Sequence, residues 1–431
     1  MTSRALLMRA AVRGERLVYR VAGLPVALRM LFRRRSLVPA DVIRTAFALA
    51  YWQPGWDNVA DIAAAILLSP IVLLGGAAWF TIRNGSAIRR REHKAVARQF
   101  VEQLRYYFTD GVLSPWYYIF RLHQDPGHPE TYLQRFETKT GIYPLLRRGV
   151  RTELNDKKIF ADYCLERGVP CVPYLFHVVP GGSIGSLPDC DLFVKPANGR
   201  GGRGAERWDR VSSGQFSGSD GRQLDSARLA DHLNARAKDC PILVQRRVEP
   251  HPDLADLTSG ALPTVRVTTC LNERGDPEIV GAVFRMAIGK NRTVDNLHAG
   301  GIAAGVDHSS GRLSSASNLG MDAKLGWLDR HPDTGAQITG RRIPLWEETT
   351  RLAINAHRSF ADRVLIGWDI AITGREPVIV EGNSSPDLDI IQRFGPPVCT
   401  SRLGDLLAWH LLDRGFTSYR KLTSATPAKA A

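Results

Sequence analysis

The feature that most constrains the fold is a cluster of glycines that follows a run of strand-forming residues. Four glycines stand within six positions of the stretch DLFVKPANGRGGRGAERW, residues 191–208, at Gly199, Gly201, Gly202 and Gly204. Glycine loses more backbone freedom on folding than other residues, so such a cluster is typical of a backbone that turns sharply or lies close to another group. Because Lys195, Arg200 and Arg203 surround the cluster, we expect that group to be an anion.

The glycine cluster fits neither of two common phosphate-binding loops. A P-loop requires Gly-Lys-Ser/Thr, which does not occur in this sequence. A dinucleotide fingerprint begins right after a strand and opens a helix, whereas here Lys-Pro intervenes and residues 206–208 begin another extended run. A hairpin between two strands fits better. Its backbone N–H groups would cover phosphates, with Lys195 as a point charge; a mobile surface turn is the alternative.

The pattern after residue 151 predicts mixed α/β structure with largely antiparallel sheets. The chain has 431 residues, of which 44% are hydrophobic and 23% charged, enough for two or three domains. Strands are predicted at residues 192–195, 242–245, 264–271, 279–286, 363–372 and 377–381. Helices are predicted at residues 156–167, 226–238, 347–360 and 403–413.

Polar residues end two neighbouring strands in the stretch IGWDIAITGREPVIVEGNSSPDL, residues 366–388. Asp369 lies on the first predicted strand, Glu381 and Asn383 end the second, and a turn at Gly374 joins them. This arrangement predicts two carboxylates and an amide oxygen close together. Hard oxygen ligands of this kind hold Mg²⁺ between a protein and nucleotide phosphates. A surface hairpin with ordinary acidic residues is the alternative.

Two arginines lie in the middle of predicted strands. Arg266 in LPTVRVTTC and Arg285 in GAVFRMAIGK both have apolar neighbours. A buried arginine requires an anion, and its planar fork suits a carboxylate or phosphate; salt bridges within the sheet are the alternative. The stretch VDNLHAGG then brings Asn296 and His298. His298 is a possible base, although a lone histidine is more often structural.

Two further stretches place polar residues at the ends of elements. In NDKKIFADYCLERGVP, residues 155–170, Lys157 opens a predicted helix that ends at Gly168. In ILVQRRVEPHPDL, residues 242–254, a predicted strand could present its backbone groups and Gln245 to the flat ring of a bound ligand. Glu249 comes four residues later, where its carboxylate could meet the hydroxyls of a ribose.

Taken in order, these motifs resemble the ATP-grasp superfamily, and within it the sugar-transfer-associated group found with cell-surface polysaccharide genes. The resemblance covers residues 155–394. It implies an α+β fold in which ATP lies between two lobes, one of which closes as a flap. It also implies an ATP-dependent carboxylate–amine ligase that forms an amide through an acyl phosphate. A phosphotransferase acting on a hydroxyl and a membrane-bound scaffold with a degenerate site are the alternatives.

The resemblance assigns roles residue by residue. ATP phosphates would be bound by Lys157 and Lys195, the flap would be formed by Gly199, Gly201, Gly202 and Gly204, adenine would meet Gln245, and ribose would meet Glu249. One or two Mg²⁺ ions would be held by Asp369, Glu381 and Asn383. The reacting groups would be handled by Arg266 and Arg285, with Asn296 near the triphosphate.

An uncharged run of 21 residues, residues 62–82, predicts a membrane segment. As a helix it would extend roughly 31 Å, the thickness of a bilayer core. Trp56 and Trp79 stand near its ends, and a basic flank follows at Arg83. Because Pro70 and two glycines interrupt the run, a re-entrant hairpin is an alternative to a single span, and a buried core helix is a third reading.

The net charge of +14 is concentrated in the first fifty residues, where Arg9, Arg13, Arg16 and Arg20 fall at helical spacing. A basic amphipathic helix on an anionic membrane surface and a solvated helix face are both consistent with this stripe. This basic balance does not by itself imply a nucleic-acid-binding fold, which would have basic residues interleaved with aromatics on one domain, so we expect no nucleic-acid partner. A nucleic-acid anchor at the basic N-terminus is a distant alternative. The six cysteines form no CxxC pair and predict thiols in a reducing compartment rather than a zinc site.

These features predict six regions along the chain. They are a basic N-terminal region (1–55), a membrane segment with its flank (56–94), a helical linker (95–154), a lid lobe (155–245), a catalytic lobe (246–420) and a disordered tail (421–431). The expected location is the cytoplasmic (inner) membrane, with the ATP-grasp domain facing the cytoplasm. The long N-terminal region stands where relatives have a compact Rossmann-like domain, which suggests an acceptor at the membrane, such as a lipid-linked glycan. The expected substrates are a small molecule or sugar with a carboxylate and an amine acceptor.

Overall fold

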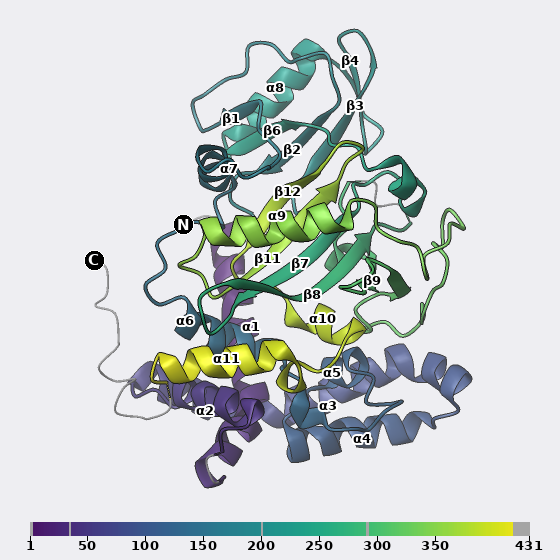
Figure 1. The fold of residues 1–431 in the computed structure, drawn as a ribbon. Coiled ribbons are helices and arrows are strands. Elements are labelled where there is room, and N and C mark those ends of the chain that lie inside the picture. The colour runs from purple at the N-terminus through teal and green to yellow at the C-terminus, as the bar shows by residue number, and fades with distance from the viewer. Residues whose placement is uncertain (1–2, 34–35, 200, 290–292, 417–431) are drawn as a thin grey trace. The chain divides into compact units, whose positions relative to one another are not determined.

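A computed structural model of the chain describes residues 3–33, 36–199, 201–289 and 293–416, with side chains from residue 14 onward. The chain divides into two compact units (Figure 1). The helical unit comprises residues 1–149, 319–326 and 387–431, and the sheet unit comprises residues 150–318 and 327–386. The predicted tail and Arg200 lie outside the described residues.

The helical unit contains eight α-helices among its described residues. They are α1 (Ser3–Phe32), α2 (Pro39–Tyr51), α3 (Trp56–Glu92), α4 (Val96–Asp110), α5 (Ser114–Ile119), α6 (Tyr143–Leu146), α10 (Leu388–Phe394) and α11 (Arg402–Asp413). Shorter turns of 3₁₀ or π helix are η1 (Pro129–Thr131), η2 (Glu137–Ile142) and η5 (Val398–Thr400). Two residues of the predicted basic stripe contact other helices: Arg16 lies 2.6 Å from Asp61 of α3, and Arg20 donates to the carbonyl of Tyr51 at 3.0 Å.

Helix α3 contains the predicted membrane segment and runs unbroken through Pro70. Proline cannot bond the carbonyl four residues earlier, which normally breaks a helix. Here the Ser69 hydroxyl donates to that carbonyl, the oxygen of Ile66, at 2.8 Å. The segment is therefore one helix and not the re-entrant hairpin. Among the described residues, α3 alone is long and apolar enough to cross a bilayer, a property of length and composition that core helices share.

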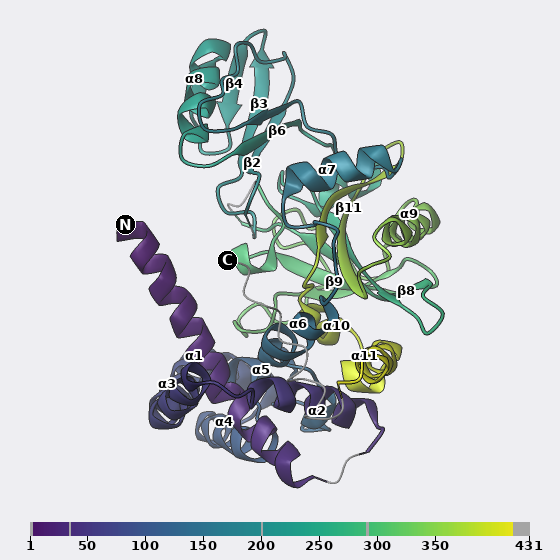
Figure 2. The ribbon, with the colours of Figure 1, turned by 90° about the vertical axis from the view of Figure 1, so that its left-hand side faces the viewer.

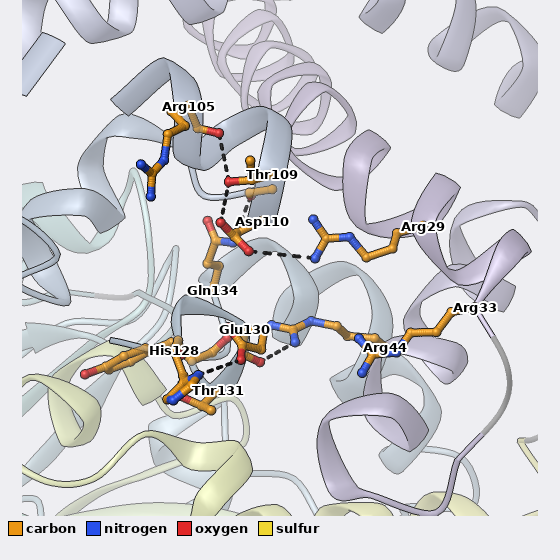
Figure 3. A network of polar contacts seen from close by, with 12 residues as sticks. Arg29, Arg33, Arg44, Arg105, Thr109, Asp110, His128, Glu130, Thr131 and Gln134 are labelled. Carbon is orange, nitrogen blue, oxygen red and sulfur yellow. Dashed lines mark hydrogen bonds and ion pairs between the residues drawn. The ribbon is translucent and has the colours of Figure 1, made fainter. Parts of the chain in front are cut away.

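Ion pairs join the helices of the helical unit (Figure 3). Arg44 of α2 is buried, and its Nε donates to Glu137 Oε1 at 3.0 Å. Its two remaining nitrogens donate to the carbonyl oxygens of Glu130 and Tyr132. Nearby, Arg29 of α1 lies 4.0 Å from Asp110 at the end of α4. Arg29 and Arg44 therefore join neighbouring helical segments.

The first sheet of the sheet unit has the order β1-β6-β2-β3-β4-β5 and is antiparallel throughout. Helix α8 covers it (Figure 2), and its Leu229 and Leu233 pack in one core with Trp208. The strands are β1 (Phe176–Val178), β2 (Leu192–Pro196), β3 (Glu206–Ser212), β4 (Gln215–Gly218), β5 (Gln223–Asp225) and β6 (Ile242–Arg246). The helices of this part are α7 (Lys157–Glu166) and α8 (Ser226–Ala237).

The second sheet has the order β10-β9-β8-β7-β11-β12 and is also antiparallel. Helix α9 (Trp346–Ser359) packs on it, and its buried His357 contacts Thr269 through Nδ1 at 2.7 Å. The strands are β7 (Thr264–Leu271), β8 (Pro277–Met286), β9 (Ile302–Val306), β10 (Leu313–Ser317), β11 (Leu365–Ile372) and β12 (Pro377–Asn383). Two 3₁₀ turns are η3 (Pro252–Leu257) and η4 (Leu297–Ala299).

The predicted elements agree with the structure to within two residues at each end, and the sheets are antiparallel as expected. The units divide the chain differently from the six predicted regions. Helix α11, which the prediction placed in the catalytic lobe, contacts α2 and belongs to the helical unit. The described residues contain no disulfide, and Cys164, Cys270 and Cys399 are buried thiols.

Candidate functional site

The first lysine of the site is fixed by a helix cap. Asp156 caps α7 by accepting hydrogen bonds from the backbone N–H groups of Lys158 and Ile159 at 2.9 and 3.0 Å. Lys157 is therefore the first helical residue. Its Nζ donates to the carbonyl of Gly199 at 2.7 Å and lies 3.9 Å from Glu381 Oε2. Lys157 thus lies between the glycine loop and β12.

The second lysine, Lys195, lies on β2 and is only 7% exposed. The pKa of its ammonium is lowered from 10.5 to about 8, chiefly by burial; the carboxylate of Glu381 opposes this shift and the charge of Lys157 adds to it. Lys195 and Glu381 are therefore close enough to interact. A buried ammonium whose neighbours include a second cation is stabilised by an added anion.

The glycines form a hairpin between β2 and β3, as the sequence predicted. The two strands pair antiparallel, with Val194 opposite Glu206. Gly201, Gly202 and Gly204 have φ of 70°, 70° and 73°, which side chains rarely adopt. A β-carbon on Gly202 would lie 2.7 Å from Val294 Cγ1, and one on Gly201 would lie 3.3 Å from Asn296 Nδ2. The loop thus needs glycine for backbone angle and for close approach to residues 294–296.

The carboxylates lie opposite one another on neighbouring strands. Asp369 of β11 pairs with Glu381 of β12, and Gly367 pairs with Asn383. The Asn383 amide fits between two partners, its nitrogen 3.2 Å from Glu381 Oε1 and its oxygen 3.3 Å from Arg266 Nη2. The structure therefore brings together the three residues that the sequence selected as metal ligands.

Both predicted arginines contact Asp369. Arg266 donates to this carboxylate twice, from Nε to Oδ1 and from Nη2 to Oδ2, the second at 2.9 Å. Arg285 Nη2 lies 3.0 Å from the same Oδ2. Burial alone would raise the pKa of Asp369, but the two guanidinium groups hold it below its ordinary value. The salt bridges within the sheet that were the alternative reading do form. Asn383 bridges Arg266 and Glu381, and Glu381 lies 3.9 Å from Lys157. The arginine cluster therefore adjoins the first lysine.

Asp295, a buried acid beside Arg285, was not predicted from the sequence. Its Oδ1 lies 3.4 Å from Arg285 Nη2, and its Oδ2 accepts from the Thr264 hydroxyl at 2.5 Å. Burial raises the pKa of Asp295, while Arg285 opposes the shift. Asp295 lies in the loop between β8 and β9, where the sequence gave little signal, because its partners come from β7 and β8.

The remaining predicted residues lie less centrally. Gln245 is buried on β6, where its Nε2 donates to the carbonyl of Val172 at 2.9 Å. Glu249 follows β6 with a 76% exposed side chain that lies 3.5 Å from Arg247. Asn296 caps η4 by accepting from the backbone N–H of His298 at 2.9 Å. Adenine and ribose contacts through Gln245 and Glu249 stay predictions.

Comparison with known proteins now identifies the family. A family model described as sugar-transfer associated ATP-grasp matches residues 144–405, more than half of the chain. The chain belongs to this ATP-grasp family. The expected family and the α+β ATP-grasp fold, with a helical N-terminal region, are thereby confirmed. The expectation of an ATP-grasp enzyme is confirmed at the level of the family.

Solved structures similar to this ATP-grasp chain are remote. The L-amino acid ligase from Bacillus licheniformis is 8% identical over 56% of this chain, with a TM-score of 0.34; the match spans 42% of that ligase. The D-alanine–D-alanine ligase from Bacillus anthracis complexed with ATP is 10% identical over 63% of this chain and 68% of its own, with a TM-score of 0.33. Their TM-scores and sequence identities are too low to support any conclusion beyond the family match. Curated proteins gave no match.

The residues of this ATP-grasp site fit Mg²⁺ in part. Glu381 and Asn383 supply hard oxygen atoms of the kind that Mg²⁺ prefers. Asp369 has both oxygens engaged by arginines and becomes a ligand only if these move. In the described part of the chain, no group of three or more His, Cys, Asp and Glu side chains is arranged for a metal. A metal here would rest on two carboxylates and an amide.

Proposed function

We propose that the protein is an ATP-dependent carboxylate–amine ligase. The observation that carries this proposal is the convergence of Lys157, Lys195 and Glu381 beside the glycine hairpin, with the Arg266–Asp369–Arg285 cluster adjoining them. Four cations around a small number of acids suit a triphosphate and the charge that develops when its terminal phosphoryl group is transferred.

The proposed reaction has two steps. An oxygen of the substrate carboxylate attacks the γ-phosphorus of ATP, which forms an acyl phosphate and releases ADP. The amine then attacks the acyl carbon, an amide bond forms, and phosphate leaves with one oxygen of the original carboxylate. The lysines hold the phosphates, and an arginine offsets charge on the reacting carboxylate. The glycine hairpin excludes water from the mixed anhydride.

Mg²⁺, when bound, would offset negative charge on the transferred phosphoryl group. Glu381 and Asn383 would hold it, and Asp369 would join them once an anion draws the arginines away. Gln245 and neighbouring backbone would meet adenine, Glu249 the ribose, and Asn296 the triphosphate. These roles follow the resemblance of their motifs and the positions of the residues around the lysines.

The substrate is proposed to belong to cell-surface polysaccharide or lipid-linked sugar synthesis at the cytoplasmic membrane. The family description names sugar transfer, and α3 has the length and composition of a membrane-binding helix. The ATP-grasp domain would then face the cytoplasm, where ATP is available.

Oxygen labelling tests the acyl-phosphate step directly. Purified protein would receive ATP, Mg²⁺, an amine donor and a panel of ¹⁸O-carboxylate amino acids and uronic acids, and the released phosphate would be analysed by mass spectrometry. We expect ¹⁸O in the phosphate and an amide product. A phosphate ester formed together with ADP, without release of phosphate, would instead establish the phosphotransferase alternative.

A matched variant separates turnover at this site from contaminating ATPase. Glu381→Gln keeps the size of the side chain and removes the charge that faces Lys157. We expect it to abolish ADP release that depends on the carboxylate substrate. Unchanged ADP release in Asp369→Ala plus Glu381→Ala would contradict the proposal and favour a degenerate scaffold.

A further inference from the structure

We propose that one face of α3 lies flat on an anionic bilayer, so that the helix binds the membrane from one side without crossing it. This inference rests on the proposed membrane association and specifies its geometry. The α3 face is defined by Leu67, Ile71, Leu74 and Ile82, and it continues into Arg89.

The residues of the α3 face are spaced four, three, eight and seven positions apart, which places them on one side of a helix. The apolar members are strongly exposed, at 77% for Leu67, 70% for Ile71, 53% for Leu74 and 81% for Ile82. Exposed apolar residues that form a continuous stripe mark an interaction surface.

Other sides of α3 contact protein, mostly in the second half of the segment. Its buried residues include Ala65, Leu73, Ala77, Thr81 and Asn84. Thr81 accepts a hydrogen bond from Gln103 of α4 at 2.7 Å, and Asn84 bonds the backbone of residues 321 and 323. Protein therefore covers part of the helix away from the α3 face, although Ile66 and Trp79 remain 52% and 62% exposed there. The three most exposed apolar side chains of residues 62–82, namely Leu67, Ile71 and Ile82, lie on the α3 face.

Charged neighbours argue against a helix that crosses the bilayer. Helix α4 runs antiparallel along α3, since Gln99 bonds the Gly85 carbonyl and Gln103 bonds Thr81. One residue from Gln103, Glu102 pairs with Lys94 at 2.7 Å and with Arg98 at 2.9 Å. At the other end, Asp61 pairs with Arg16. These charges lie at the two ends of residues 62–82. Between them, α4 continues past Gln103 to Asp110, which lies 4.0 Å from Arg29, and Ser114 just beyond it lies near Gly76. A span would draw the Arg29–Asp110 pair toward hydrocarbon, where charges are costly, whereas a helix in the plane of the interface leaves it in water.

Anionic lipid is the partner whose chemistry matches this face. Arg89 follows Ile82 by seven residues on the same side, and Arg90 and Arg91 are exposed beside it. Trp56 and Trp79 are 90% and 62% exposed, and tryptophan favours the boundary between headgroups and acyl chains. A bilayer surface supplies both an apolar layer and negative headgroups, as in-plane amphipathic helices require.

Vesicle flotation tests the surface with full-length protein and liposomes of phosphatidylcholine, alone or with one quarter phosphatidylglycerol. We expect binding that depends on phosphatidylglycerol and that falls at least tenfold in Leu67→Glu plus Ile71→Glu. The control is Leu165→Glu, which places the same charge on an equally exposed leucine of α7 (80%) and should bind like the parent. Circular dichroism confirms that each variant is folded. Wild-type dimerisation without vesicle binding would overturn the proposal.

Tag accessibility distinguishes an in-plane helix from a span. Epitope tags at the two chain ends should both resist protease in intact spheroplasts and both be cleaved after lysis. Cleavage of one tag alone in intact cells would establish a crossing helix and overturn this inference, while the proposed ligase reaction would be unaffected. Conversely, failure of the oxygen-labelling test would leave the vesicle and tag results intact.

Discussion

Each unit of the protein contains a buried arginine–carboxylate cluster, and the two clusters are built differently. In the helical unit, Arg44 pairs with Glu137, and its other nitrogens donate to the carbonyl oxygens of Glu130 and Tyr132. Figure 3 shows Arg44 beside Glu130. Every charge there has its counter-charge within the protein. In the sheet unit, two arginines share the carboxylate of Asp369, and Arg285 also faces Asp295.

The site in the sheet unit carries excess positive charge. Four cations, Lys157, Lys195, Arg266 and Arg285, stand against three acids, Asp295, Asp369 and Glu381. Buried arginine–carboxylate pairs therefore have different roles in the two units. A closed, neutral cluster stabilises the fold, whereas an open cluster with unbalanced charge has lower stability until an anion binds.

The largest effect is expected from opening the closed cluster. Arg44→Met should lower the free energy of unfolding by about 3–5 kcal/mol, because it leaves the fully buried Glu137 without its counter-charge. Urea denaturation measures this loss. Turnover per folded molecule should stay close to that of the parent protein.

The control for this prediction removes both charges. Arg44→Met plus Glu137→Gln should recover part of the lost stability, because no unpaired charge is then buried. If the double variant is no more stable than Arg44→Met, the cost comes from lost packing and the electrostatic reading of this cluster is wrong.

The opposite result is expected in the open cluster. Lys195→Met should reduce ATP turnover on the order of 10²–10³, the usual cost of one electrostatic contact to the reacting charge. Its free energy of unfolding at pH 7 should rise by up to about 3 kcal/mol, because a pKa of about 8 against an ordinary 10.5 reflects a destabilised buried ammonium. A variant that loses stability along with activity would show that Lys195 is structural.

Activity at the open cluster should depend on the protonation of Lys195. Activity should fall about tenfold per pH unit above a pKa near 8, as Lys195 loses its proton. Between pH 8 and 10.5 the unfolded chain binds more protons at Lys195 than the folded one, so its contribution to the free energy of unfolding rises with pH. Lys195→Arg should remove the alkaline fall in kcat/KM even if its maximum is lower. An unchanged alkaline limb in this variant would assign the titration to another group.

The sequence predicted the open cluster better than the closed one. Lys195, the glycine hairpin and the Asp369–Glu381 pairing were predicted because they lie in short local patterns of strand, turn and polar residue. The turn at Gly374 predicted that the two strands are neighbours, whereas their register, which shifts between Asp369 and Ile370, was not predicted. Such patterns can be read without knowing which distant strands are neighbours.

Contacts between distant elements were not predictable in the same way. Arg44 meets Glu137 across 93 positions, and Arg266 meets Asp369 across 103. Apolar neighbours indicated that Arg266 needs an anion but not which one. The carbonyl that Pro70 leaves without its helical partner accepts a hydrogen bond from the Ser69 hydroxyl, a contact that no hydrophobicity pattern reveals.

The smallest effect is expected from the glycine hairpin that borders the open cluster. Gly202→Ala should raise KM for ATP about five- to thirtyfold, which corresponds to about 1–2 kcal/mol for a side chain at positive φ. The new methyl group would also lie 2.7 Å from Val294 Cγ1. Steady-state kinetics with varied ATP measures the change. Gly199→Ala is the matched control, because no positive φ is recorded there and its β-carbon would lie 3.4 Å from Pro196.

Adding Val294→Ala separates the two causes. If the clash dominates, Gly202→Ala plus Val294→Ala should recover most of the ATP affinity, whereas backbone strain would leave KM as high as in the single variant. Equal KM values for Gly202→Ala, Gly199→Ala and the parent would mean that the hairpin does not approach the nucleotide. The excess positive charge beside it would then need another explanation than a triphosphate.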